Sequence, residues 1–523
     1  MTETTQRPGF YEKLSYGVGD AASNLFWMTC IYFLLYFYTD VFGISAAAAG
    51  TMMLYTRLFD TANDPIMGMI ADRTTTRWGK FRPYILFGAA PFAITGVLVF
   101  TTPDLGATGK LVYAYITYSL FLLTYTIVNV PYSSLMGVVS SNPGERTSFS
   151  AFRFTFAYLG GIFVQTLTLP MVEYIGGETK QALGFQVTVA LYAVLAMLLF
   201  LVTFYGTRER VKVPGTQSGN WRKEITDLVK NLPLIIGFFI LLALFISSPT
   251  LKYGIPLLIA TAVIVFYVQK QRKRPESEIS NAQKDLINLV TNGPWLIVSL
   301  VGVMTLLWVS IKNAVTVYYF KYFIKGGMVL PFIGEISNTT LTTAFIVGGT
   351  ITTLLGTMST RVLVSWFGKV RLYIGLMFIN ACMIGVVYFM TPEDMPLIFT
   401  LQICGSFLGG PTAPIVFSMY ADTADYSEWK HGRRATGLVF SAAGFAQKMG
   451  WTIGGAVAGI LLGYYGFQAN MEQTEETLHG IRMLVAVIPA FVAFMSGVIM
   501  FFYRLDDNTM KQIERDLEAR KSS

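Results

Sequence analysis

Long apolar stretches recur along this chain, and most are long enough to cross a lipid bilayer as helices. They fall into two sets of six. The first set lies near 16–39, 46–71, 84–101, 111–140, 149–172 and 184–205. The second set lies near 294–322, 341–360, 372–390, 395–421, 435–463 and 481–503. This pattern predicts an all-α integral membrane protein built from two six-helix bundles.

The segment between the two sets, Gly206–Gly293, contains two further apolar runs. Leu232–Leu251 carries no charge, and Tyr253–Val268 would reach only about 24 Å as a helix, short of a hydrocarbon core of about 30 Å. The pair could therefore cross the membrane or form a re-entrant or interfacial hairpin. We predict two extra spans, which brings the total to about 14.

Basic residues concentrate in the loops on one side of the predicted membrane, while the opposite loops carry acids. Since Lys and Arg favour the cytoplasmic side, both termini are expected to be cytoplasmic in a plasma (inner) membrane. The expected organisation is an N-terminal bundle (1–205), a cytoplasmic linker with two extra hydrophobic helices (206–293), a C-terminal bundle (294–505) and a cytoplasmic tail (506–523).

The two halves share an internal repeat in the loop between their second and third helices. In the first half this loop runs from Gly68 to Gly79-Lys80, and in the second from Gly356 to Gly368-Lys369. The spacing agrees within one residue. Halves repeated in the same orientation are typical of major facilitator transporters, although coincidence between two basic loops is the alternative.

Composition supports a membrane protein and narrows its function. Of the 523 residues 53% are hydrophobic and 13% are charged, whereas soluble domains carry about 25% charged residues. The net charge of +8 reflects basic cytoplasmic loops, so it does not imply nucleic-acid binding. The three cysteines lie in apolar segments and the two histidines are isolated in loops, which argues against a disulfide framework or a histidine-based metal site.

Sequence motifs for catalysis are missing. No Gly-Lys pair is followed by Ser or Thr in a phosphate-binding loop, and no zinc-protease or serine-hydrolase motif occurs. The chain is therefore not expected to be an enzyme or to need a cofactor. Any energy for transport would come from an ion gradient.

The most informative polar residues are two carboxylates, Asp60 and Asp64, within the second apolar segment. Each costs about 2.5–3.5 kcal/mol at the centre of a membrane helix, and their i,i+4 spacing puts both on one helical face. Asn63 lies beside Asp64, and Pro65 frees a backbone carbonyl nearby. This oxygen-rich set suits a hard cation or a shared proton. The alternative is a structural ion pair between Arg57 and Asp60.

Other polar residues at membrane depth come from several helices and are expected to line one central polar cavity. They include Asp20, Tyr125, Thr126, Asn129, Arg153 and Lys448. With aromatic faces such as Trp27 and Trp451, they supply the donors, acceptors and flat surfaces that a hydroxyl-rich ligand needs. Each could instead be an interfacial or snorkelling group.

Several stretches resemble the glycoside–pentoside–hexuronide:cation symporter family, to which the melibiose permease belongs. The matching stretches are Lys13–Asp20, Tyr36–Asp40, Arg57–Gly68, Arg77–Pro83, Ala421–Lys430 and Gln447-Lys448. The resemblance covers almost the whole chain except 206–293 and implies a major facilitator fold.

The resemblance also implies roles for individual residues. The cation would bind at Asp60, Asn63, Asp64 and Thr126, with Asp60 and Asp64 as the metal ligands if the ion is Na⁺. The sugar would face Asp20, Tyr125, Asn129, Arg153 and Lys448, while Asp422 and Arg434 would act in gating. Asn129 and Ser133 stand where the melibiose permease has an acid and a tryptophan, which puts galactoside recognition in doubt.

We therefore expect a symporter, coupled to Na⁺ or H⁺, that imports a sugar or sugar derivative and functions as a monomer in the lipid bilayer. One possibility is an acidic sugar held by Arg153 and Lys448, since Asp20 is the chief acid opposing these two bases. The other is a neutral pentoside whose hydroxyl bonds to Asn129, with Asp20 paired to Lys448. The rival interpretations are a transporter of a lipid-like or other amphipathic solute, and a non-transporting membrane sensor that uses 206–293 as its interaction module.

Overall fold

The computed structural model describes residues 8–140, 142–177, 179–210, 256, 261, 281–326, 328–330, 334–432 and 436–522. The two apolar runs predicted as extra helices lie outside the described residues except for single positions, and so does Arg434. The chain divides into two compact units. The first comprises Met1–Phe239, Met328–Ala344 and Gln468–Met471, and the second comprises the remainder.

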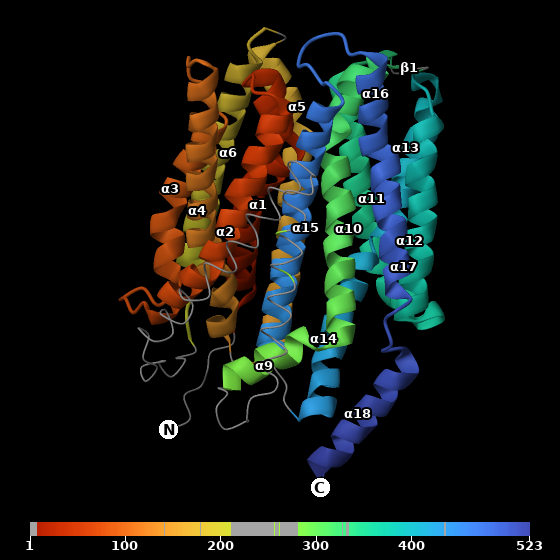
Figure 1. Cartoon of the computed structure of the whole chain (residues 1–523). Coiled ribbons are helices and arrows are strands. Elements are labelled where there is room, and N and C mark those ends of the chain that lie inside the picture. The colour runs from red at the N-terminus through yellow and green to blue at the C-terminus, as the bar shows by residue number, and fades with distance from the viewer. Residues whose placement is uncertain are drawn as a thin grey trace. The chain divides into compact units, whose positions relative to one another are not determined.

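The first six apolar segments form helices of the first unit, as predicted. These are α1 (Phe10–Tyr36) with a π-helical end, η1 (Phe37–Val41), followed by α2 (Ala46–Arg73), α3 (Arg82–Val99), α4 (Ala107–Val139), α5 (Pro143–Gly176) and α6 (Gln181–Gly206). Helix α1 packs against α5 and α6, and α3 packs against α4 and α6 (Figure 1). Helix α2 packs against α4, which brings the predicted cation-binding segment beside the helix that carries Thr126.

The second half begins with the short α9 (Asn281–Val290) and continues with long helices. The elements are α10 (Gly293–Tyr318), η3 (Tyr319–Ile324), α11 (Asn338–Phe367), α12 (Lys369–Val386), η4 (Val387–Phe389), η5 (Pro392–Asp394), α13 (Met395–Gly409), α14 (Thr412–His431), α15 (Thr436–Tyr464), α16 (Glu475–Arg482), η6 (Met483–Val487), α17 (Ile488–Met500) and α18 (Asp507–Ser522). Helix α10 packs against α15 and α17, and α12 packs against α13 and α17.

Two details differ from the sequence prediction. The single helix expected over 395–421 is divided into α13 and α14 at Gly410-Pro411, where Pro411 has no backbone N–H to continue the helical hydrogen bonds. The expectation of helices alone is also incomplete, because β1 (Met328–Leu330) and β2 (Gly334–Ile336) form a short antiparallel hairpin.

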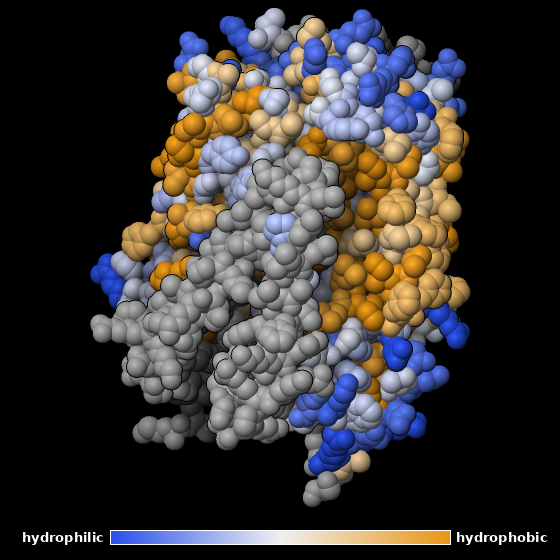
Figure 2. Space-filling view, in the orientation of Figure 1, coloured by the Kyte–Doolittle hydropathy of each residue, from blue (hydrophilic) through white to orange (hydrophobic). Residues whose placement is uncertain are grey.

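Among the described residues, nine helices are long and apolar enough to cross a membrane. Helix α2 is not among them because Arg57, Asp60 and Asp64 lower its hydropathy. In Figure 2, hydrophobic residues cover the middle of the visible helices of the second unit, with hydrophilic residues at both helix ends. The count of 14 spans stays a prediction.

The first copy of the repeated loop is held by a carboxylate that the sequence did not point to. Glu209 accepts hydrogen bonds from the backbone N–H groups of Lys80, Phe81 and Arg82 at 2.7, 2.8 and 3.1 Å, at the start of α3. Gly79 has φ +110°, and a Cβ atom there would lie 2.6 Å from the Glu209 carboxyl carbon. Glycine is therefore required for this close approach.

The second copy also has a positive-φ glycine but uses a different polar contact. Gly368 has φ +75° and directly precedes α12. Beside it, the Lys369 ammonium lies 2.6 Å from a carboxylate oxygen of Asp422 on α14. The predicted repeat thus extends to a positive-φ glycine before the third helix of each half.

Candidate cation and substrate site

The two membrane-depth carboxylates meet a hydroxyl from the neighbouring helix. The Thr126 Oγ1 atom on α4 lies 2.8 Å from Asp60 Oδ1 and 3.0 Å from Asp64 Oδ1. Asp60 and Thr126 are 6% and 1% exposed, while Asp64 is half-buried. Helix α2 runs unbroken through Pro65, so the i,i+4 spacing places both acids on the face that meets α4, as expected.

These three side chains form an oxygen cluster of two carboxylates and one hydroxyl. Within the described part of the chain, no group of three or more His, Cys, Asp or Glu residues could hold a metal ion. A transition-metal centre therefore has no ligand set in the described residues. The ligand types present at Asp60, Asp64 and Thr126 suit a proton or a hard monovalent cation. Asn63, the fourth residue of the predicted set, is partly buried beside Asp64 on α2.

Arg57, one turn before Asp60 on α2, is held by aromatic side chains. Its Nε atom donates to the Tyr118 hydroxyl at 2.8 Å, and its guanidinium carbon lies 5.4 Å from the centre of the Trp27 ring. Arg57 and Asp60 lie three residues apart on α2 and so share a helix face, as the structural alternative requires. Asp60 nevertheless shares Thr126 with Asp64, so an Arg57–Asp60 pair does not account for the whole arrangement.

A second charged pair in the first unit joins α1 to α5. The Arg153 Nε atom lies 3.2 Å from Asp20 Oδ1, and the guanidinium carbon is 5.3 Å from the centre of the Tyr132 ring. Tyr132 stacks on Tyr16 at 4.8 Å between ring centres. Asp20 therefore pairs with Arg153, whereas the neutral-pentoside interpretation paired it with Lys448.

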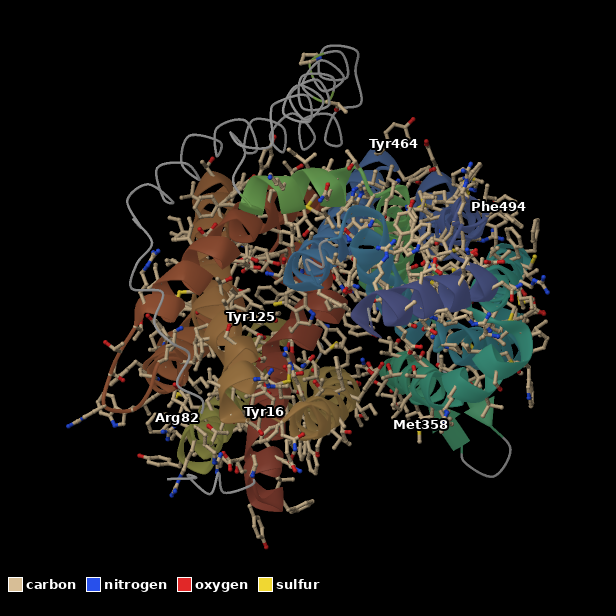
Figure 3. The ribbon with its side chains drawn as sticks, turned by 90° about the horizontal axis from the view of Figure 1, so that it is seen from below. Tyr16, Arg82, Tyr125, Met358, Tyr464 and Phe494 are labelled. Carbon is tan, nitrogen blue, oxygen red and sulfur yellow. The ribbon has the colours of Figure 1, made fainter. Side chains whose placement is uncertain are left out.

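Aromatic and amide groups lie on the same helices. Tyr125 directly precedes Thr126 on α4 and stacks on Trp27 of α1, with 5.3 Å between ring centres. Asn129 is partly buried one turn beyond Tyr125. Figure 3 shows Tyr16 and Tyr125 within the helices of the first unit, viewed along the bundle.

Two of the remaining predicted residues belong to the second unit, and one lies outside the described residues. Lys448 is partly buried on α15 of the second unit. Asp422 is buried on α14, where it pairs with Lys369, a partner that the sequence analysis did not assign to it. Arg434, the other predicted gating residue, lies outside the described residues.

Lys312, the single charged residue of α10, was not among the residues predicted from the sequence. Its Nζ atom donates to Gln402 Oε1 on α13 at 2.6 Å. The sequence did point to this residue, because a lysine in the apolar segment 294–322 is as unexpected as the two acids in α2.

The sequence pattern of the family described as MFS/sugar transport protein matches residues 15–255 and 250–507. The chain is 31% identical to the inner membrane symporter YicJ of Escherichia coli K12, over 98% of this chain and 95% of that protein. It is 32% identical to the putative glycoside/cation symporter YagG of the same organism, over 99% and 96% of the two chains. It is 31% identical to the isoprimeverose transporter of Lactiplantibacillus pentosus, over 97% and 91%.

Solved structures support the fold alone. A bacterial homologue of the human peptide transporters PepT1 and PepT2 superposes with a TM-score of 0.62, covers 97% of this chain and 99% of its own, and is 12% identical. The family pattern and the sequence relatives confirm the resemblance found in the sequence.

Proposed function

Because the chain belongs to the MFS/sugar transport family, we propose that it is a symporter, driven by Na⁺ or H⁺, that imports a sugar or sugar derivative by alternating access. Members of this family are multi-pass membrane transporters rather than enzymes, which agrees with the missing catalytic motifs. The ion, the sugar and the direction of transport are part of the proposal.

The observation that carries the coupling proposal is the hydroxyl shared by two acids. Thr126 has one hydroxyl proton, yet its oxygen lies within hydrogen-bond distance of Asp60 and Asp64. It can donate to only one carboxylate at a time. The second contact becomes favourable if the other carboxyl group is protonated and donates in return, or if a cation lies among the three oxygens.

Coupling follows from the position of this cluster. The cation would neutralise two acids on α2 and hold them to Thr126 on α4. The residue before Thr126, Tyr125, stacks on Trp27 of α1. A loaded cluster would therefore fix an aromatic surface on which a sugar ring can pack. The sugar would bind more tightly to the loaded form, and this difference in affinity is what coupling requires.

We further propose that the sugar is neutral. Asp20 neutralises Arg153, and the pair still offers donors and acceptors for hydroxyl groups. Asn129 adds an amide that can both donate and accept, and Lys448 is the remaining candidate from the second unit. The similarity to a glycoside/cation symporter and to an isoprimeverose transporter supports a sugar over a lipid-like solute.

The test is uptake by proteoliposomes containing the full-length protein, with a panel of radiolabelled pentosides, hexosides and uronates and with imposed Na⁺ or pH gradients. We expect accumulation of at least one neutral sugar with one of the gradients. An Asp60→Asn variant should reach the membrane but lose accumulation. Competition by glucuronate or galacturonate without competition by xylosides or glucose would contradict the neutral-sugar proposal, and gradient-independent uptake would contradict coupling.

We also propose that both termini are cytoplasmic, that the protein acts as a monomer, and that the segment predicted as an extra pair is peripheral to transport. Deleting 232–268 and rejoining its flanks should leave some uptake. A sensor that uses 206–293 to signal would show the reverse pattern, tolerating loss of Asp64 but not of this segment.

A further inference from the structure

Arg57 and Tyr118 connect the cation cluster to the aromatic surface proposed for the sugar by a second route. Both side chains are buried in the first unit, with Arg57 5% and Tyr118 0% exposed. The Arg57 Nε atom on α2 donates to the Tyr118 hydroxyl on α4 at 2.8 Å. A guanidinium at membrane depth is costly to bury, and specific contacts of this kind lower that cost. The Tyr118 hydroxyl therefore helps to fix where the Arg57 guanidinium lies.

The Trp27 ring on α1 contacts both Arg57 and Tyr125. The Arg57 guanidinium carbon lies 5.4 Å from the centre of the Trp27 ring, within the range of a cation–π interaction. The same ring stacks on Tyr125, with 5.3 Å between ring centres and an interplanar angle of 21°. Arg57 is therefore in contact with one of the two rings that we propose as the sugar-binding surface.

Arg57 is also close to the cation cluster along α2. It lies one turn before Asp60 and two turns before Asp64, which places the three side chains on one face of the helix. Hydrogen bonds join this face to α4 at each of the three residues. Without a cation, the two carboxylates attract the guanidinium, and a bound cation cancels this attraction. Occupancy of the cluster therefore changes the force on the Arg57 side chain.

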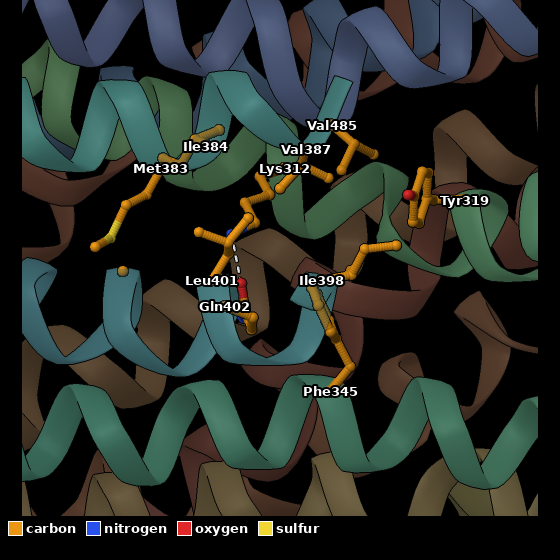
Figure 4. Close-up of a pocket in the computed structure, with 11 residues that line it drawn as sticks. Lys312, Tyr319, Phe345, Met383, Ile384, Val387, Ile398, Leu401, Gln402 and Val485 are labelled. Carbon is orange, nitrogen blue, oxygen red and sulfur yellow. Dashed lines mark hydrogen bonds between the residues drawn. The ribbon is translucent and has the colours of Figure 1, made fainter. Parts of the chain in front are cut away.

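Lys312 of the second unit is a buried base that is held in a different way. Its Nζ atom donates to Gln402 Oε1 at 2.6 Å (Figure 4). The pocket around this contact is lined mainly by apolar side chains, and the Phe345 ring centre lies 5.9 Å from the ammonium. Gln402 is therefore a position at which a hydrogen bond can be removed from a buried base without altering Trp27 or the cation cluster.

We propose that Arg57, held by Tyr118, is a positioning residue that sets the orientation of the Trp27 ring according to the occupancy of the cation cluster. This inference rests on the proposed function, because it explains how a cation would prepare the sugar-binding surface. With the cluster empty, the two acids draw the guanidinium away from the Trp27 ring. With a cation bound, the guanidinium remains over that ring and holds it in the stack with Tyr125.

The experiment follows Trp27 directly by fluorine NMR of the full-length protein labelled with fluorotryptophan. The chain has eight tryptophans, and the signal that is lost in Trp27→Phe belongs to Trp27. Sodium chloride is titrated against choline chloride at constant ionic strength, and pH is titrated separately, so that both candidate coupling ions are covered. We expect the Trp27 signal to shift and then saturate with one of them. Asp64→Asn should abolish this shift, because it removes an acid of the cluster.

Two variants test the positioning role. Tyr118→Phe removes only the hydroxyl, and Arg57→Lys keeps the charge but loses the planar group with several donors. Losing one hydrogen bond to a charged group changes an equilibrium constant by about tenfold or more. The cation-dependent shift of the Trp27 signal should therefore fall to a small fraction of the wild-type shift in both variants. If Arg57→Lys does not fold, Tyr118→Phe alone decides.

Two control variants remove hydrogen bonds elsewhere. Tyr113→Phe is the matched control on α4, since the Tyr113 hydroxyl donates to the Leu98 carbonyl on α3 at 2.9 Å. Gln402→Leu removes the hydrogen bond of Lys312 and controls for the loss of a buried contact as such. Both controls should keep the wild-type shift, because neither residue contacts the Trp27 ring or the cluster through these hydrogen bonds.

The outcomes separate this inference from the proposed function. A wild-type shift in Tyr118→Phe, or a shift that survives in Asp64→Asn, would overturn the inference and leave the proposed symport intact. The same holds if the Trp27 signal responds to neither ion in a protein whose uptake depends on a gradient. Uptake that is independent of both gradients would overturn the proposed function, and this inference with it.

Discussion

Replacing Thr126 by valine tests the proposed cation cluster with the smallest change in shape. Valine is close to threonine in size but cannot contact Asp60 Oδ1 or Asp64 Oδ1, which lie 2.8 and 3.0 Å from the hydroxyl oxygen. Because Thr126 is 1% exposed, water cannot readily replace the lost group. The change therefore removes one ligand oxygen and leaves both acids in place.

The size of the effect follows from the kind of contact that is lost. A hydrogen bond or ligand contact to a charged group contributes about 1.5–3 kcal/mol, and about 1.4 kcal/mol corresponds to a tenfold change in affinity. Thr126→Val should therefore weaken cation binding by about 10- to 100-fold. Sugar binding at saturating cation should change little, because valine leaves the neighbouring Tyr125–Trp27 stack intact.

The assay is sugar uptake by proteoliposomes as a function of cation concentration, which yields the concentration for half-maximal rate. Thr124→Val is the matched control, since it removes a hydroxyl from the same helix that bonds to Thr95 at 2.8 Å, outside the acidic cluster. The control should keep the wild-type cation dependence. A half-maximal concentration for Thr126→Val within twofold of the wild type would refute the assignment of this cluster as the coupling site.

Three further changes follow from the same structure. Asp64→Asn should abolish gradient-driven accumulation while the protein still reaches the membrane, and wild-type accumulation would exclude a coupling role. Arg153→Lys should lower sugar affinity in binding assays, because one ammonium cannot reproduce the fork of donors that faces Asp20; an unchanged affinity would remove this pair from the sugar site. Gly79→Ala should destabilise the protein by about 1–3 kcal/mol because of its φ of +110°, whereas Gly137→Ala, with open space around it, should not lower the unfolding midpoint.

The positions of the membrane helices and the exceptional acids could be predicted from the amino-acid sequence alone. Both are local signals. A run of about 20 apolar residues predicts a membrane helix without knowledge of the neighbouring helices. The bilayer thickness sets the length of the run, and the backbone N–H and C=O groups can pair only within the helix. A carboxylate inside such a run is equally visible, and Asp60 and Asp64 were found in this way. Lys312 carries the same signal and was overlooked.

Which polar groups contact each other depends on how the helices pack and could not be predicted from helix positions. Thr126 is 66 residues from Asp60, and Arg153 is 133 residues from Asp20, so each contact depends on how two helices pack. The sequence placed Thr126 in the cation set through family resemblance, not through spacing. It gave no sign that Glu209 holds the start of α3, or that Lys369 is the partner of Asp422. The helical period shows which face of a helix is polar, but the packing of the whole bundle decides which neighbouring helix contacts that face.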